Sequence, residues 1–153
     1  MKSINYIILH CSDSVWGSAR EIEKWHKARG WAGIGYHYVI TNGWILPKLF
    51  LNVFDGSIEC GRILDEDAWI EENEIGSHTL GLNAESVGVC LIGVSKFSEL
   101  QMTTARGLVW DLGKLYGVPY SNVLGHYETP SGKAQGKTCP NFDMKQFRES
   151  LLR

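Results

Sequence analysis

Residues 4–11 read INYIILHC, an almost continuously apolar run with polar residues on either side. A short run of this composition is typical of a strand that is buried on both faces of a sheet. Side chains alternate between the two faces, so His10 and Cys11 point in opposite directions and cannot hold one ion together. We therefore expect a central strand that ends in a histidine, at a position where strands open toward loops.

Length and composition favour one globular domain. The chain has 153 residues, of which 44% are hydrophobic and 21% are charged, and this is enough to build a core. A net charge of -2, a pI near 6.2 and the lack of any lysine or arginine run argue against nucleic-acid binding. Nothing resembles a signal peptide or a membrane-inserted segment, and four cysteines are few for a disulfide scaffold. We expect a soluble protein that is made in the cytoplasm.

The remaining sequence alternates between strand and helix signals. Capping residues predict three helices, which begin after Ser18, Ser98 and Asp143. Further strands are expected at 35–40, 86–93 and 123–124. Asn42-Gly43 and Asp55-Gly56 are turn signals, the first of them typical of a hairpin. The acidic segment 64–75 is expected to be a solvated loop or short helix at one edge. Together these signals predict an α/β fold with helices on the faces of a sheet.

The segment 123–143, VLGHYETPSGKAQGKTCPNFD, has the composition of a functional site. Pro140 disfavours a helical conformation for Cys139, so we expect Cys139 to be extended. In an extended segment Lys137 and Cys139 point to the same side, and a nearby cation favours the thiolate. His126 lies thirteen residues before Cys139. A histidine and a cysteine of this kind form half of a zinc site or half of a cysteine-nucleophile site.

His10, His126 and Cys139 together could complete a catalytic zinc site. Two neutral imidazoles and a thiolate leave a fourth coordination position open, which is the catalytic rather than the structural arrangement. Zinc lowers the pKa of water and polarises a carbonyl, while Lys137 and Tyr36 would donate hydrogen bonds to the oxyanion. The alternative from the same residues is a metal-free hydrolase with Cys139 as nucleophile and His126 as base.

Several short motifs occur in an order and spacing that resemble the type 2 N-acetylmuramoyl-L-alanine amidases. This family includes the short lysozymes of tailed phages and the animal peptidoglycan recognition proteins. The resemblance is strongest to the phage lysozymes and covers almost the whole chain. Its motifs are ILHCS (8–12), WHK (25–27) with GW (30–31), GYHY (35–38), GSH (76–78), SVGVCL (86–91), GH (125–126) and KTCPNFD (137–143).

The resemblance implies a zinc amidase that cuts the bond between N-acetylmuramic acid and L-alanine in peptidoglycan, with a central mixed sheet flanked by helices. The zinc ligands of the family match His10, His126 and Cys139. The two catalytic side chains match Tyr36 and Lys137. Positions along the substrate groove match Ser77, His78 and Asn83.

Three segments look longer than in the shortest phage members, namely 44–53, 64–75 and 127–136. The first two would alter the groove walls and the stem-peptide preference. The third contains glycines, so Lys137 is expected to be mobile until substrate or zinc orders it.

The resemblance also implies a biological role. We expect residues 1–153 to form one catalytic domain without a separate cell-wall-binding domain, acting as a phage endolysin. The protein would accumulate in the host cytoplasm and reach the wall from the periplasm after release by a partner holin. Some family members also bind a phage RNA polymerase, which this sequence alone does not support. The alternatives are a cytoplasmic wall-recycling amidase and a non-catalytic peptidoglycan-binding module, against which the presence of Cys139 argues.

Overall fold

A five-stranded mixed sheet forms the centre of the computed structural model, which describes residues 1–153. Its strand order is β4-β3-β6-β2-β7. The strands are β2 (Tyr6–Cys11), β3 (Tyr38–Leu46), β4 (Leu49–Cys60), β6 (Ser86–Leu91) and β7 (Val123–Gly125). Strand β2 pairs in parallel with β6 and β7, and β3 pairs in parallel with β6 and antiparallel with β4. The expected central mixed sheet is confirmed, and a second small sheet joins β1 (Lys2–Ser3) to β5 (Trp69–Ile70).

Three of the four α-helices begin where the capping residues predicted, and the short helix at Pro130–Ala134 was not predicted. The main helices are α1 (Ala19–Ala28), α2 (Glu99–Tyr116), α3 (Pro130–Ala134) and α4 (Met144–Ser150). Short 3-10 turns lie at η1 (Glu72–Glu74), η2 (Asn83–Glu85), η3 (Tyr120–Asn122) and η4 (His126–Glu128). The side chains of Ser18, Ser98 and Asp143 each accept a hydrogen bond from a backbone N–H in the first helical turn. None of these helices combines the length and the apolar character needed to cross a bilayer.

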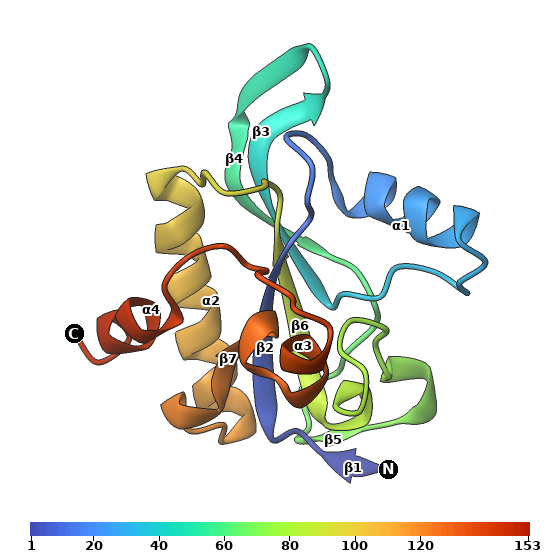
Figure 1. Ribbon diagram of the computed structural model, residues 1–153, viewed down its shortest axis with the longest axis vertical. Helices are drawn as coiled ribbons and strands as arrows, with labels where there is room; N and C mark the ends of the chain where they lie inside the picture. Colours follow the sequence, from blue (N-terminus) through green and yellow to red (C-terminus); the bar gives the residue numbers. More distant parts are fainter.

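The two faces of the sheet carry different cores. Helix α1 lies on one face, and α2 and α4 lie on the other (Figure 1). Ile7 and Leu9 of β2 pack into the larger cluster, which includes residues of α2 and α4. The opposite face packs under α1 in a smaller cluster of Ile22, Ile34, Val39, Cys90 and Ile92. Because side chains alternate along β2, His10 emerges on the side of the smaller cluster, where the core leaves room for a site.

The two predicted turns at Asn42-Gly43 and Asp55-Gly56 are wrong. Strand β3 continues through Asn42-Gly43, and the hairpin turns at 47–48 instead. Gly43 and Gly56 do have positive φ angles of 88° and 76°, but the register shifts between β3 and β4 place these residues in or beside bulges. Glycine in a bulge gives the same sequence signal as glycine in a turn. Strand β3 also starts at Tyr38 rather than at Gly35.

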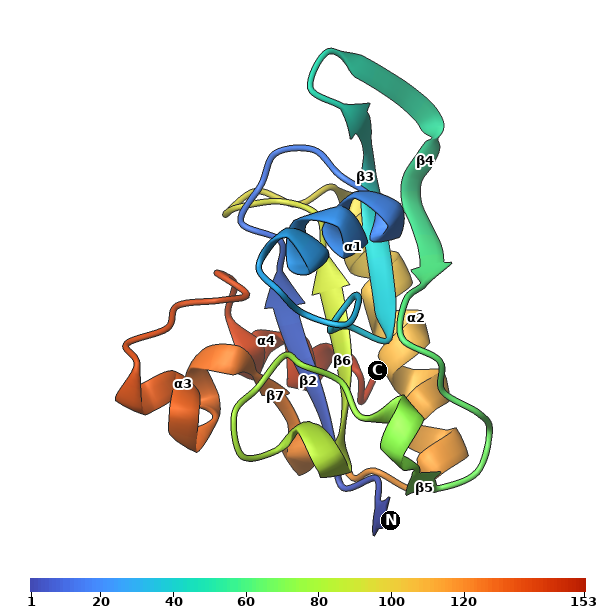
Figure 2. The same cartoon turned by 90° about the vertical axis from the view of Figure 1, so that its right-hand side faces the viewer.

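The segment 44–53 forms the tip of the β3–β4 hairpin, which projects beyond the rest of the molecule (Figure 2). Its apolar side chains are exposed and include Trp44, Leu46, Leu49, Phe50 and Val53. The segment 64–75 contains β5 and η1. Its Glu74 side chain is buried and accepts hydrogen bonds from the backbone N–H groups of Asp65 and Glu71. The segment 127–136 contains α3, so it is partly helical rather than an open loop.

Candidate active site

Three side chains with metal-binding chemistry converge at one edge of the sheet. His10 is the second-last residue of β2, His126 follows β7, and Cys139 lies between α3 and α4. One ligand atom from each of these residues lies within 4.8 Å of the other two. Cys139 Sγ is 3.8 Å from His10 Nδ1, and the ring centroids of His10 and His126 are 4.7 Å apart. The structure therefore brings together the three residues that the sequence predicted as zinc ligands.

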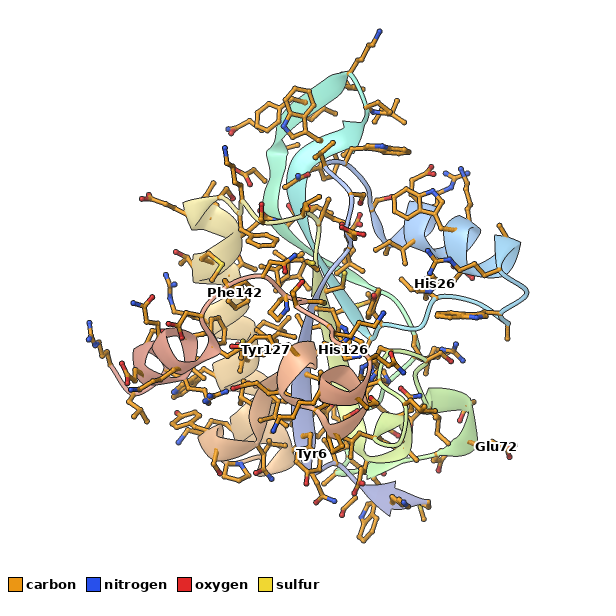
Figure 3. All side chains as sticks on the ribbon, in the orientation of Figure 1. Tyr6, His26, Glu72, His126, Tyr127 and Phe142 are labelled. Atoms are coloured by element: carbon orange, nitrogen blue, oxygen red, sulfur yellow. The ribbon has the colours of Figure 1, made fainter.

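Strand register explains why the two histidines meet. Strands β2 and β7 are parallel neighbours, and Leu9 pairs with Gly125. The next residues are His10 and His126, so both side chains leave the same edge of the sheet. Figure 3 shows His126 near the middle of the molecule, where the chain between β7 and α3 crosses the sheet.

Backbone contacts hold Cys139 beside this pair. The Tyr127 N–H donates to the Cys139 carbonyl at 3.0 Å, which ties the segment to the turn after His126. The Cys11 N–H donates to Cys139 Sγ at 3.1 Å. Cys11 thus contacts the site through its backbone. Its side chain lies next to the Cys139 thiol, and each thiol changes the pKa of the other, as described below.

The protonation states of the metal-free site follow from burial and from these neighbours. Burial holds the pKa of His10 well below its usual value, and burial followed by the Lys137 charge lowers the pKa of His126. Both imidazoles are therefore neutral at pH 7, as ligands must be. The interaction between the neighbouring thiols lowers the pKa of Cys11 to about 7 and raises the pKa of Cys139. A divalent cation at the site would favour the Cys139 thiolate instead.

A pocket of about 790 Å³ opens over the three residues. Tyr36 lies on one wall, with its ring centroid 5.0 Å from that of His10 and 5.5 Å from that of His26. Lys137 lines the pocket as well and is exposed. Its N–H donates to the Gly132 carbonyl at 2.9 Å, which anchors the backbone of Lys137 to α3. The two predicted catalytic side chains therefore line the same pocket as the candidate ligands.

Ser77, His78 and Asn83 also line this pocket. His78 is only 8% exposed, and its ring lies against the ring of His10. The Asn83 side-chain carbonyl accepts hydrogen bonds from the N–H groups of His78 and Thr79, at 2.9 and 2.8 Å. Contact of these three residues with substrate stays a prediction. Within the protein, His78 contacts His10, and Asn83 binds the backbone of His78.

Arg29 and Trp31 line the pocket, although the sequence did not single them out as site residues. They follow α1, and the Arg29 guanidinium lies 6.0 Å from the centroid of the Trp31 ring. The exposed tryptophan just after a helix-ending glycine was the available signal, but nothing in the sequence tells which loop faces the pocket. His26 also lines the pocket and accepts a hydrogen bond from the Gly35 N–H through Nδ1 at 3.0 Å.

Comparison with known proteins agrees with this geometry. The family model for N-acetylmuramoyl-L-alanine amidase matches residues 1–142. The chain is 33% identical to the endolysin of Escherichia phage T7 over 160 residues, covering 97% of this chain and 87% of the relative. It is 34% identical to the endolysin of Enterobacteria phage T3, covering 94% and 84% of the two chains.

Solved structures show the same fold. The amidase LysC from Clostridium intestinale matches with a TM-score of 0.75 and 26% identity, covering 99% of this chain and 87% of that chain. Drosophila PGRP-LB matches with a TM-score of 0.61 and 26% identity, covering 94% and 85%. On the family match, the endolysin relatives and the shared fold, this chain belongs to the N-acetylmuramoyl-L-alanine amidase family and is an enzyme of that class.

Proposed function

We propose that this amidase is zinc-dependent and that His10, His126 and Cys139 hold one zinc ion. The observation that carries the proposal is the approach of their three ligand atoms to within 4.8 Å of one another at the edge of the pocket. Two neutral nitrogens and one thiolate suit zinc and leave a position for water or substrate. When bound there, zinc would supply Lewis-acid chemistry, lowering the pKa of water and polarising the scissile carbonyl.

Tyr36 and Lys137 are proposed to stabilise the negative charge that develops on the carbonyl oxygen. Burial raises the pKa of Tyr36 well above its usual value, so its hydroxyl remains a hydrogen-bond donor at neutral pH. Lys137 adds a positive charge from another part of the pocket lining. Donors that are fixed before the reaction stabilise an oxyanion without costly reorganisation, and removing one such donor costs roughly 100- to 1000-fold in rate.

The substrate class is peptidoglycan, in line with the amidase family and with the relatives. Drosophila PGRP-LB, one of the structural neighbours, has been solved as a mutant in complex with tracheal cytotoxin. We propose that the stem peptide lies along the pocket past Ser77, where Arg29 and Lys137 offer positive charge to its carboxylates. Trp31 offers an exposed apolar surface beside them.

The biological role that we propose is that of a phage endolysin that acts on the host cell wall. The support comes from the T7 and T3 relatives, which are both endolysins. We further propose that the protein accumulates in the host cytoplasm and passes to the periplasm through a partner holin. Binding to a phage RNA polymerase stays a prediction of the family resemblance.

Digestion of purified sacculi separates this proposal from its alternatives. Mass spectrometry of the products is expected to show free stem peptides that begin with L-alanine, together with glycans that carry an intact lactyl group. A peptidoglycan-binding module would release nothing. A strong chelator is expected to abolish the activity and added zinc to restore it, whereas full activity in chelator would favour Cys139 as a nucleophile.

A further inference from the structure

A chain of three hydrogen bonds extends from His10 away from the pocket. His10 Nε2 lies 2.9 Å from His78 Nδ1, and His78 Nε2 lies 3.4 Å from the Ser86 hydroxyl. The Ser86 hydroxyl donates to the Leu82 carbonyl at 2.8 Å. All three side chains are at least 90% buried, so water does not compete for these partners. His10 is thus bonded through the nitrogen that does not face Cys139.

Burial keeps both histidines neutral by lowering the pKa of each, and with neutral rings only one arrangement of protons satisfies the whole chain. The Leu82 carbonyl can only accept a hydrogen bond, so the Ser86 hydroxyl donates to that carbonyl. The Ser86 oxygen must then accept a hydrogen bond from His78 Nε2. A neutral His78 that carries its proton on Nε2 has a free lone pair on Nδ1, which accepts from His10 Nε2. His10 therefore carries its proton on Nε2, and its Nδ1 lone pair faces Cys139 Sγ at 3.8 Å.

We propose that His78, held by Ser86, is a positioning residue that fixes the tautomer and the ring orientation of His10 so that Nδ1 is free to bind zinc. This inference rests on the zinc site of the proposed function. A histidine ligand generally donates its other N–H to a fixed acceptor, and losing that acceptor weakens metal binding about 10- to 100-fold. The opposite tautomer of His78 would place the His10 proton on Nδ1, where it would block the metal.

The surrounding structure holds His78 in this place. The His10 and His78 rings meet edge to face, with centroids 5.0 Å apart and an interplanar angle of 89°. A Cβ atom on Gly88 of β6 would lie 2.7 Å from Cγ of His78, so the glycine provides the room for this ring. Asn83 binds the backbone N–H of His78. These contacts give Gly88 and Asn83 a role in orienting His78 that does not require contact with substrate.

Zinc titration of the purified, metal-free protein against a competing chelator tests the proposal. His78→Leu removes the acceptor and is expected to weaken zinc binding about 10- to 100-fold. His78→Asn places a carbonyl oxygen close to the position of Nδ1 and should bind zinc within a few-fold of the wild type. Val87→Ala is the matched control, since Val87 is a fully buried neighbour on β6 outside the hydrogen-bond chain. It should unfold at a lower temperature and bind zinc normally.

NMR of the histidine ring nitrogens in the metal-free protein reads the tautomers directly and does not depend on activity. The wild type is expected to carry the proton on Nε2 in both His10 and His78, while His78→Leu should show a mixture of His10 tautomers. Unchanged zinc affinity in a folded His78→Leu variant, or a wild-type His10 proton on Nδ1, would overturn the proposal. If the wild type bound no zinc, the proposed function would fail instead, and the ring-nitrogen spectra would still decide the tautomer order.

Discussion

Replacing Glu128 with glutamine is expected to lower the free energy of unfolding by about 2 kcal/mol at neutral pH. The Glu128 carboxylate accepts two hydrogen bonds from the Arg148 guanidinium, at 2.7 and 2.9 Å, and one from the Gly125 N–H at 2.9 Å. This pair ties α4 to the turn that presents His126. Hydrogen bonds to charged groups contribute about 1.5–3 kcal/mol each. The low end applies because both side chains are partly exposed and Arg148 keeps its bond to the Val123 carbonyl.

Thermal unfolding monitored by circular dichroism measures this effect. A loss of about 2 kcal/mol corresponds to a Tm lowered by roughly 4–8 °C in a domain of this size. Burial acts to raise the pKa of Glu128, but the bonds from Arg148 lower it below the usual value of 4.5. Because this folded-state pKa is lowered, the stabilisation is present above pH 4.5 and is lost as the pH falls through the folded value. The difference between wild type and variant should therefore shrink in acid.

Glu149→Gln is the control, because this substitution removes the same charge from an exposed residue of the same helix. Its Tm should stay close to that of the wild type. Equal Tm values for Glu128→Gln and the wild type at pH 7, or a difference that persists unchanged at pH 3, would refute the reasoning.

Three further predictions concern the site and its support. Tyr36→Phe should keep zinc and fold but lose roughly 100-fold or more in rate on sacculi, and normal turnover would remove Tyr36 from the mechanism. Lys137→Gln should lower the rate similarly while leaving the Tm unchanged, because Lys137 is exposed; a wild-type rate would contradict its role. Burial lowers the pKa of His37 from 6.5 to about 4. Below pH 6.5 the unfolded chain binds a proton at His37 that the folded protein does not bind, so the free energy of unfolding falls by about 3 kcal/mol between pH 6.5 and pH 4. Urea unfolding should show His37→Gln to be less pH-dependent than the wild type, and identical profiles would contradict this.

Much of the fold could be predicted because its signals are local. The apolar run of β2 and the capping side chains of Ser18, Ser98 and Asp143 determine conformation within a few residues, and the structure has these elements as expected. The β3–β4 hairpin was misplaced because a glycine with positive φ serves in a bulge as well as in a turn. Only pairing with the neighbouring strand distinguishes the two cases.

The candidate ligands could be named from the sequence, but their partners could not. His10 and His126 meet because Leu9 pairs with Gly125, and this long-range register leaves no mark in either segment. The bond between His10 and His78 likewise joins residues 68 positions apart. The sequence could therefore identify His78 only by family resemblance, as a residue of the substrate groove, and its contact with His10 required the structure.

X-ray absorption spectroscopy at the zinc edge tests the central claim most directly. Purified protein loaded with one equivalent of zinc is expected to show one sulfur and two imidazole nitrogens around the metal, and Cys139→Ser should lose the sulfur contribution and most of the bound zinc. A wild-type spectrum without sulfur, or an active enzyme that takes up no zinc, would contradict the account.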